Sequence, residues 1–582
     1  MMRSTLLALA NASAAIASAA SLSSVCTNDN IIAALPPDDV YLGITIDRTY
    51  ATSNVVTNSS VTSNFFPDAV IDYCNVTVAY SHTDRDDRVL LQFFLPAPSN
   101  FQNRWLSNGG GGLAIYAGEQ SIPGGVIYGA VSGATDGGFG SFATELDGVL
   151  ILANGTINWE SVFMFGYQAH HEMSTIGKAF SRLFYNMTDS EKLYAYYEGC
   201  SEGGREGWSQ IQRYGDEWDG AVVGAPAFRF SHQQVNHLFA GVVEKTLDYY
   251  PPPCEMDKIL NLTIAACDPL DGRSDGVVSR SDLCKLKFDL NSTIGQPYYC
   301  AASSATGVAK RQAGGATLPA QNGTVTAQGV AVYQAITDGL KDSQGRQAYL
   351  SYALGAALDD AETSYNSTSG TWYAAPGGIG GEFVAMFLDL LDETNIDSLD
   401  GVTYDTLVSW MWEGWQMYQD TLQTTWPDLT PWYESGAKII HFHGESDFSI
   451  PTASSVYWYE SVRQIMYPGL AYNDSTEALG DWYRLYLVPG AGHCAVNDLQ
   501  PNGPFPQTNL AVMIDWVENG VKPVTLNATV LQGANEGENQ QLCAWPLRPL
   551  WSKNGTDQTC VYDQASLDTW KYNFDAFKLP VY

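Results

Sequence analysis

The chain has few basic residues, few histidines and only one long apolar run, near its start. Its 29 lysines and arginines face 63 aspartates and glutamates, which gives a formal net charge of -34. Nucleic acid and anionic membrane surfaces repel such a protein, so neither is expected as a partner. Beyond the first twenty residues no run reaches about 18 apolar residues, so no transmembrane helix is expected. Internal repeats and heptad patterns are also absent from the sequence.

The first twenty residues are expected to be a signal peptide. The sequence MMRSTLLALANASAAIASAA (1–20) combines one basic residue, Arg3, with an apolar run and a small-residue end suited to cleavage. The alternative is a short buried helix. A signal peptide predicts a secreted, extracellular protein.

Cysteines and glycosylation sequons agree with secretion. Ten cysteines, an even number, predict five disulfides in an oxidising compartment. Eleven Asn-x-Ser/Thr sequons outside the signal peptide predict heavy glycosylation. These sequons begin at Asn58, Asn75, Asn154, Asn186, Asn261, Asn291, Asn322, Asn366, Asn473, Asn527 and Asn554.

The order of the segments predicts an α/β protein. Short apolar segments that end in glycine-rich turns predict strands, and a helix is predicted over 202–214. Strand, tight turn, helix and strand form the unit of a parallel sheet. The predicted strands are 89–96, 104–108, 193–197, 220–224, 438–443 and 482–488.

The length of 582 residues exceeds that of one ordinary compact core, so two domains or an inserted domain are expected. The strand pattern stops between about 230 and 430, where cysteines, an Ala/Gly/Ser-rich piece (301–321) and helical patterns such as 381–391 replace it. We therefore predict a discontinuous catalytic domain interrupted by an insertion. The catalytic domain comprises 21–229 and 430–582, and the insertion comprises 230–429.

A nucleophilic serine is predicted in the segment EGCSEGG (198–204). Gly199-x-Ser201-x-Gly203 lies between a predicted strand and a predicted helix. This is the pattern of a nucleophile elbow, in which a strained turn exposes the serine and small neighbours allow close chain packing. Ser201 is therefore the predicted nucleophile.

The serine needs a base and the base needs an orienting carboxylate. Only His493, among eight histidines, lies in a glycine-rich loop directly after a late strand, so it is the predicted base. His441 and His443 lie within a strand and are predicted to be core or pocket-lining residues. Asp447 leaves the preceding strand and is the predicted acid, with Glu445 as the alternative.

Two cysteines flank the predicted nucleophile and base. Cys200 precedes Ser201, and Cys494 follows His493. A Ser–His hydrogen bond of about 3 Å would bring these cysteines side by side, so we predict a Cys200–Cys494 disulfide that fixes the histidine loop to the elbow. The alternative is that Cys200 is a free nucleophile.

Several motifs resemble one known family, the secreted fungal tannase and feruloyl esterase family. The resemblance runs over essentially the whole mature chain and rests on the Cys-Ser, Asp and His-Cys arrangement. Its motifs are GCSEGGREG (199–207), NGGGG (108–112), HGESD (443–447) and PGAGHC (489–494). Three segments resemble the tannase branch: YYPPPCE (249–255), CDPLDGRSDGVVSRSDLC (267–284) and GVTYDTLVSWM (401–411).

The resemblance implies an α/β-hydrolase fold with a large inserted lid domain. It also implies a serine esterase that uses Ser201, Asp447 and His493 to release gallic acid from galloyl ester and depside bonds of tannins and alkyl gallates. We expect polar and aromatic lid residues to contact the gallate ring. Alternatives are a feruloyl esterase, a lipase, and an inactive polyphenol-binding glycoprotein, which would predict damaged catalytic motifs.

An oxyanion hole is expected beside the serine. One donor should be the backbone N–H of Glu202, the residue after the nucleophile. A second should come from the glycine loop 109–112, and Gly110 and Gly111 are the residues considered. The alternative role for these glycines is a tight turn.

An acidic loop in the insertion predicts a structural calcium ion. Asp268, Asp271 and Asp275 lie close together in sequence with glycines between them, and hard oxygen ligands at short spacing suit Ca²⁺. The spacing is not that of an EF-hand. The resemblance adds the backbone carbonyls of Arg273 and Val277. The alternative is a solvated acidic loop closed by a disulfide; no organic cofactor is expected.

A dibasic pair, Lys310-Arg311, is a predicted processing site, with an uncleaved pair as the alternative. The resemblance favours cleavage, because tannases can mature into two chains. Seven cysteines precede the pair and three follow it, so full pairing needs a bridge across the cut, which Cys200–Cys494 supplies. The sequence is also compatible with a homo-oligomer. The other expected pairs are Cys26–Cys74, Cys254–Cys300, Cys267–Cys284 and Cys543–Cys560.

Overall fold

The computed structural model describes residues 20–116, 118, 121–304, 317–361, 363–552 and 555–582. The predicted signal peptide up to residue 19, the Lys310-Arg311 pair and Asn554 lie outside these residues. Within them, no helix is both long and apolar enough to cross a membrane.

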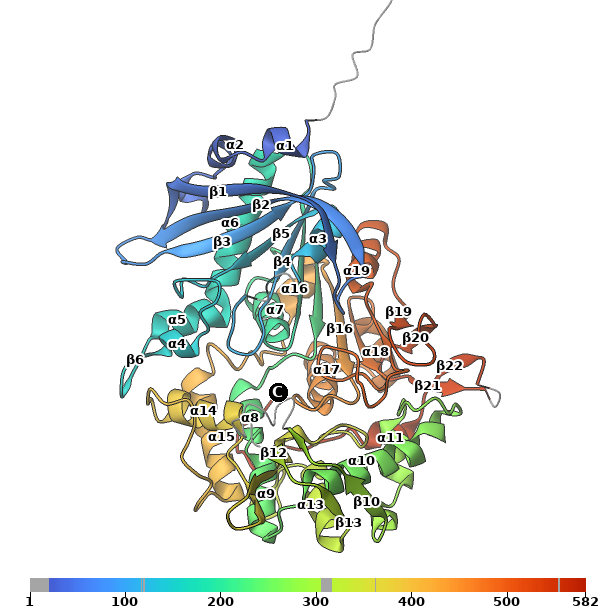
Figure 1. Ribbon diagram of the computed structural model, residues 1–582. Coiled ribbons are helices and arrows are strands. Elements are labelled where there is room, and N and C mark those ends of the chain that lie inside the picture. Colours follow the sequence, from blue (N-terminus) through green and yellow to red (C-terminus); the bar gives the residue numbers. More distant parts are fainter. Residues whose placement is uncertain (1–19, 117, 119–120, 305–316, 362, 553–554) are drawn as a thin grey trace, which may run out of the picture.

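A nine-stranded sheet forms the upper half of the molecule in Figure 1. Its order is β1-β2-β3-β5-β4-β8-β9-β16-β17. The first four strands pair antiparallel, and all pairs from β5 to β17 are parallel. The bounds are β1 Ile44–Val61, β2 Ala69–His82, β3 Val89–Leu95, β4 Arg104–Asn108, β5 Ala130–Thr135, β8 Tyr194–Cys200, β9 Gly220–Gly224, β16 Lys438–Gly444 and β17 Tyr483–Val488.

Helices cover the sheet and bury its parallel strands. Every residue of β9 (GAVVG) is buried, as expected for a central parallel strand covered on both faces. Helix α6 (Ala169–Phe184) packs on β4 and β5, and α7 (Glu202–Arg213) packs on β8 and β9. Helix α19 (Asn509–Asn519) packs on β9 and β16. Because β8, β9, β16 and β17 run parallel, the carboxyl ends of β8, β16 and β17 lie at the same end of the sheet.

All six predicted strands are present as β3, β4, β8, β9, β16 and β17, and the predicted helix is α7. The α/β class is therefore confirmed. Strands β1, β2 and β5 were not predicted. The segment of β1 contains many Ser, Thr and Asn residues, and much of it is exposed, so its strand conformation depends on pairing with β2 rather than on an apolar pattern.

The insertion lies between β9 and β16, which are neighbours in the sheet. It forms the lower half of the molecule in Figure 1. The helical pattern predicted over 381–391 is realised as α14 (Gly378–Glu382) followed by a π-helical segment, Phe383–Leu388. Its other main helices are α8 Phe230–Asn236, α9 Phe239–Leu247, α10 Pro253–Cys267, α11 Ser281–Lys287, α13 Ala327–Thr337 and α15 Tyr404–Tyr418.

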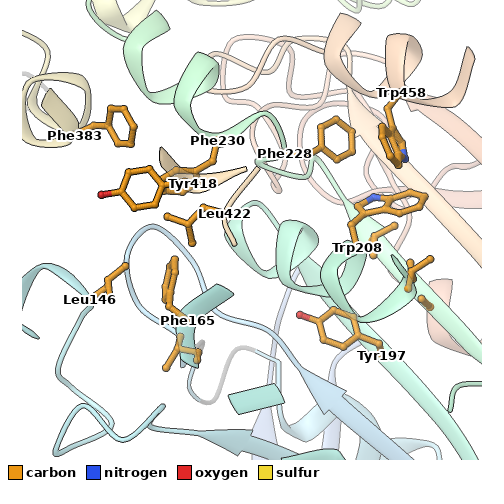
Figure 2. Packing of buried hydrophobic residues seen from close by; sticks show 14 of the residues in the cluster. Leu146, Phe165, Tyr197, Trp208, Phe228, Phe230, Phe383, Tyr418, Leu422 and Trp458 are labelled. Carbon is orange, nitrogen blue, oxygen red and sulfur yellow. The ribbon is translucent and has the colours of Figure 1, made fainter. Parts of the chain in front are cut away.

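One buried hydrophobic cluster joins the sheet domain to the insertion. Figure 2 shows Trp208 of α7 beside Phe228 and Trp458, with Phe230 near Phe383. The Trp208 and Trp458 ring centroids, both in the sheet domain, are 5.3 Å apart, and those of Trp159 in the sheet domain and Tyr418 in the insertion are 5.9 Å apart. The division into 21–229 plus 430–582 and 230–429 stays a prediction, but the core is continuous across its boundaries.

The C-terminal segment also ties the two halves together. The Tyr572 hydroxyl lies 2.7 Å from the Ser351 Oγ, and the Gln347 N–H donates to Asp575 Oδ1 at 2.7 Å. Figure 1 places the C-terminus between the sheet domain and the insertion, where the Tyr582 carbonyl accepts a hydrogen bond from Arg229. Part of the segment assigned to the catalytic domain thus packs against the insertion.

The five expected disulfides are all formed. They are Cys26–Cys74, Cys200–Cys494, Cys254–Cys300, Cys267–Cys284 and Cys543–Cys560.

Candidate active site

Ser201 occupies the sharp turn between β8 and α7. Its φ of 63° and ψ of -123° lie in a region that non-glycine residues rarely adopt, which stores about 1–3 kcal/mol of backbone strain. Gly203 allows the close approach of the next loop, because a Cβ atom there would lie 2.8 Å from the Gly110 carbonyl oxygen. The predicted elbow is therefore the geometry that the chain adopts.

The three predicted catalytic side chains form one hydrogen-bonded series. His493 Nε2 lies 2.8 Å from Ser201 Oγ. Its Nδ1 lies 2.8 Å from Asp447 Oδ2. Ser201 follows β8, Asp447 follows β16 and His493 follows β17, so the parallel sheet brings together residues that are up to 292 positions apart in the chain.

Asp447 is held as a carboxylate. It is buried, and its Oδ1 accepts the backbone N–H groups of Ser449 and Ile450 at 2.8 and 2.9 Å. Burial alone would raise the pKa of Asp447. The charge of His493 and hydrogen bonds from His443 and His493 outweigh burial, and they hold this pKa well below its ordinary value. The acid is thus ionised at any pH at which the site could work.

The structure decides against two alternatives. Glu445 does not face His493: its carboxylate accepts Arg548 Nη2 and Ser281 Oγ, each at 2.6 Å, in a buried cluster. Cys200 is not a free thiol, because it is bonded to Cys494. This bridge joins the residue before the serine to the residue after the histidine, and its two Cα atoms are 6.1 Å apart.

The oxyanion-hole prediction is only partly supported by the geometry. Glu202 is the first residue of α7, so its N–H has no acceptor within the helix and lies beside Ser201. The Gly110 N–H, in contrast, donates to Glu206 Oε2 at 2.7 Å. The Gly111 N–H donates to the Ala114 carbonyl at 2.9 Å. Both glycine donors are already engaged, so this conformation does not offer them to an oxyanion.

Glu206 is a residue of this site that the sequence analysis missed. Its side chain is fully buried in α7, holds the glycine loop through Gly110 and lies 3.0 Å from His170 Nε2. The signal in the sequence was a charged residue one and a half turns after the nucleophile in a helix that packs on the sheet. No pattern linked that residue to the glycine loop.

A cavity of about 340 Å³ opens over the Ser201–His493 pair. Its described lining residues all belong to the predicted catalytic domain, so none comes from the lid that was expected to hold the aromatic ring. A larger cavity, of about 600 Å³, contains none of the three predicted catalytic residues. The smaller cavity is lined by Phe65, Gly109, Gly110, Gly111, Gly112, Tyr116, Ser121, Cys200, Ser201, His493 and Cys494.

The acidic loop predicted to bind calcium folds into a tight set of turns. Asp268 Oδ1 accepts the Asp275 N–H at 2.9 Å, and Asp271 Oδ1 accepts the Arg273 N–H at 2.9 Å. Burial and the charges of neighbouring aspartates raise the pKa of Asp271 and of Asp275 to about 6. In the described part of the chain, however, no group of three or more His, Cys, Asp or Glu side chains is placed to hold a metal ion.

This acidic loop packs against the loops that follow β16 and β17, which carry Asp447 and His493. The Val278 N–H donates to Gln500 Oε1 at 2.8 Å, and Gln500 Nε2 donates to Ser446 Oγ, next to Asp447, at 2.7 Å. Asn502 Nδ2 donates to the Asp275 carbonyl at 2.7 Å. The loop therefore supports the site, although it belongs to the insertion.

Ten of the eleven sequon asparagines lie in the described residues, and none of them is buried. Asn75 and Asn527 are partly exposed, whereas the other eight are exposed. This accessibility is compatible with the predicted glycosylation, which stays a prediction.

Known proteins resemble the chain over nearly its whole length. A family model described as tannase and feruloyl esterase matches residues 74–566. The chain is 54% identical to a tannase of Aspergillus oryzae, over 98% of each chain. It is 29% identical to a probable feruloyl esterase of Arthroderma benhamiae, over 86% of this chain and 88% of that relative.

Solved structures give the same result. The tannin acyl hydrolase from Aspergillus niger matches with a TM-score of 0.93 and 63% identity, covering 97% of this chain and 99% of that one. Feruloyl esterase B from Aspergillus oryzae matches with a TM-score of 0.65 at 22% identity, covering 90% and 97%, and shares the fold. The predicted α/β-hydrolase fold is confirmed by these matches and by the parallel sheet with its elbow. The chain belongs to the tannase and feruloyl esterase family.

Proposed function

We propose that the protein is a serine esterase that hydrolyses the galloyl ester and depside bonds of hydrolysable tannins and alkyl gallates and releases gallic acid. The observation that carries the proposal is the pair of 2.8 Å hydrogen bonds that joins Ser201, His493 and Asp447 beside a cavity. The tannase from Aspergillus oryzae and the tannin acyl hydrolase from Aspergillus niger, at 54% and 63% identity, support galloyl esters as the substrate class.

The residues perform the reaction in two steps. In the first, Ser201 Oγ attacks the ester carbonyl while His493 Nε2 takes the hydroxyl proton, and the same proton passes to the departing alcohol. In the second, His493 removes a proton from water, which attacks the acyl-serine. The acyl–Oγ bond then breaks, His493 gives the proton to Ser201 Oγ, and gallic acid leaves. The Glu202 N–H is placed to stabilise the negative oxygen in both tetrahedral intermediates.

Asp447 orients the base and stabilises its positive charge. Its Oδ2 accepts His493 Nδ1–H, so the other ring nitrogen is left to accept the serine proton. The Cys200–Cys494 bridge keeps the two loops that carry Ser201 and His493 at a fixed separation.

The expected substrate preference is for gallate over ferulate esters. We expect kcat/KM for methyl gallate to exceed that for methyl ferulate by tenfold or more, which corresponds to about 1.4 kcal/mol in transition-state binding. A ratio reversed in favour of ferulate would retain the triad and identify the protein as a feruloyl esterase. Phe65, Tyr116 and Ser121, the cavity residues outside the triad, the glycine loop and the disulfide, are the first positions to exchange.

We also propose that the protein is secreted, glycosylated and cut after Arg311. The support is the signal-like residues 1–20, the accessible sequons and the dibasic pair. The amino-terminal sequences of the secreted protein identify both cleavage points, and loss of mass after endoglycosidase treatment measures the glycans.

A structural Ca²⁺ is proposed for the loop of Asp268, Asp271 and Asp275, with the carbonyls of Arg273 and Val277. Its support is the chemistry of the donors: two carboxyl groups with pKa values raised to about 6 lie among like charges, and a divalent cation would remove that repulsion. The carboxylates would have to turn toward the ion, because they do not converge in this conformation.

Chelation is expected to destabilise the protein and to slow turnover. At pH 7 excess EGTA should lower the unfolding temperature by about 5 °C or more. It should also lower kcat, because the loop contacts Gln500 and through it the Asp447 loop. At pH 5 the change should be smaller, since protons then occupy Asp271 and Asp275 and compete with the ion.

Asp275→Asn should reproduce the effect of EGTA and no longer respond to it. Asp338→Asn, which changes an exposed carboxylate of the same domain, should behave as the wild type. Absence of calcium in elemental analysis of the purified secreted protein, together with no response to EGTA, would refute the site.

A further inference from the structure

Two buried histidines that the reaction does not use lie on β16, and one of them contacts the triad carboxylate. His441 and His443 are two residues apart on β16, so their side chains lie on the same face of the strand. Both are fully buried. His443 Nε2 lies 3.0 Å from Asp447 Oδ2, the same oxygen that accepts His493 Nδ1–H. The sequence analysis assigned these histidines to the core or to a pocket wall, and neither lines the cavity over Ser201.

A series of hydrogen bonds continues from His443 into the core. His443 Nδ1 lies 2.6 Å from the Oγ of Ser455, on α17 (Ala453–Met466). The same Oγ lies 2.7 Å from His441 Nε2, and His441 Nδ1 lies 2.9 Å from the Tyr483 hydroxyl on β17. Ser455 and Tyr483 are fully buried, so no water competes for these bonds.

With both rings neutral, the acceptors at one end of the series fix every proton in it. His443 Nε2 faces only acceptors, the Asp447 carboxylate and the Ile450 carbonyl, each at 3.0 Å, so it carries the hydrogen. In the neutral ring Nδ1 is then an acceptor, and the single hydroxyl proton of Ser455 points to it. Ser455 Oγ can therefore only accept from His441 Nε2–H, and His441 Nδ1 accepts from Tyr483.

This assignment satisfies every group without a charge on either ring. Burial lowers the pKa of His441 well below its ordinary value, and burial raises the pKa of Tyr483 well above its own. Both groups are therefore neutral. The other titratable groups that act on the series are His493 after β17, Tyr459 and Glu460 on α17, and His237, Tyr352 and Asp360 from the insertion.

We infer that His443 is a positioning residue for the proposed hydrolysis, because its Nε2–H holds Asp447 in the orientation that His493 requires. Ser455, His441 and Tyr483 act behind it by fixing its tautomer. The inference rests on the proposed function, since it needs Asp447 to serve His493. Asp447 accepts two backbone N–H groups on Oδ1, so His443 supplies the second donor to Oδ2 and completes its hydrogen bonding.

Loss of this donor has two consequences. Asp447 gains freedom to rotate away from His493, which lowers kcat but not substrate binding. The carboxylate also carries more uncompensated charge, which favours protonated His493, so the acid side of the pH profile of kcat/KM moves to higher pH.

The test compares His443→Met, which keeps the volume without a donor, with His443→Gln, which keeps an N–H donor of similar reach. We expect His443→Met to lower kcat about 10- to 100-fold, the factor for loss of a hydrogen bond to a charged group, with KM within about twofold. The acid side of its pH profile should move up, and His443→Gln should recover most of kcat and the wild-type profile. Equal kcat in the two variants, or an unmoved acid side in His443→Met, would overturn the inference.

Ser455→Ala tests the same series one bond further away, and it decides the matter if His443→Met fails to fold. We expect a smaller fall in kcat, about threefold to tenfold, and a shift of the acid side in the same direction. A wild-type kcat and profile would overturn the inference. Ser201→Ala, measured in the same assay, distinguishes failure of the proposed function from failure of the positioning role. If Ser201→Ala remains active, the catalytic assignment fails. If Ser201→Ala is inactive and His443→Met is fully active, only the positioning role is refuted.

Discussion

Replacing Ser201 by alanine should lower kcat about 10⁵- to 10⁶-fold on methyl gallate, which is the effect of removing the nucleophile from a Ser-His-Asp site. The substitution removes the atom that forms the acyl-enzyme, and Cys200 cannot replace it as nucleophile, because its sulfur is bonded to Cys494. Binding of gallate should persist, since the cavity keeps its other walls. Stopped assays at high enzyme concentration and titration of gallic acid binding measure the two quantities.

Ser209→Ala is the matched control. Ser209 is a buried serine of α7, the helix that begins directly after Ser201, and its hydroxyl donates to the Glu206 carbonyl at 2.6 Å. Its replacement costs about 1 kcal/mol of stability at most and should leave kcat unchanged. If Ser201→Ala kept wild-type turnover, the nucleophile would be wrong. If the wild type itself hydrolysed neither gallates nor ferulates, the esterase proposal would fall as a whole.

The hydrogen-bonded series of Ser201, His493 and Asp447 was predictable because each member obeys a local rule. Ser201 lies in a Gly-x-Ser-x-Gly turn between strand and helix, and Asp447 and His493 follow strands of a parallel sheet. Parallel strands end at one edge, so residues after them meet whatever lies between them in sequence. The predicted contact between Ser201 and His493 led in turn to the prediction of the Cys200–Cys494 disulfide, and this bond is present.

The supports of the triad were not predictable in the same way. Glu206, Gln500 and the series behind His443 depend on hydrogen bonds between segments that are far apart in the chain. No local pattern marks such contacts, and buried polar residues are most often simple core residues. The donor expected from the glycine loop stays a prediction for a related reason: the Gly110 and Gly111 N–H groups are used by Glu206 and Ala114, which the sequence could not show.

The outer antiparallel strands of the sheet show a second limit of prediction from the sequence. Strands β1 and β2 were not foreseen, because their conformation comes from pairing with each other and with β3. Their segments contain many polar residues, and β1 is largely exposed. Strand β9, in contrast, is an uninterrupted apolar run and was located to the residue.

The Cys200–Cys494 disulfide is expected to contribute most to both stability and turnover. It spans 294 positions, so the chain-entropy estimate gives about 5 kcal/mol or more of stability. Among the five bridges it alone crosses residues 310–311. If the chain is cut there, a variant without the bridge should separate into two pieces on a denaturing, non-reducing gel, whereas the wild type should not.

The double variant Cys200→Ser/Cys494→Ser should lose kcat about 10- to 100-fold while KM changes about twofold at most. The reason is that the bridge fixes the separation of the Ser201 and His493 loops, and a displacement of about 1 Å costs that much in rate. Cys26→Ser/Cys74→Ser is the control: its bridge spans 48 positions in the N-terminal region, so the change should remove about 4 kcal/mol of stability and leave kcat intact. A wild-type kcat in the first variant, or an equal loss in the control, would show that the bridge stabilises the fold without positioning the catalytic residues.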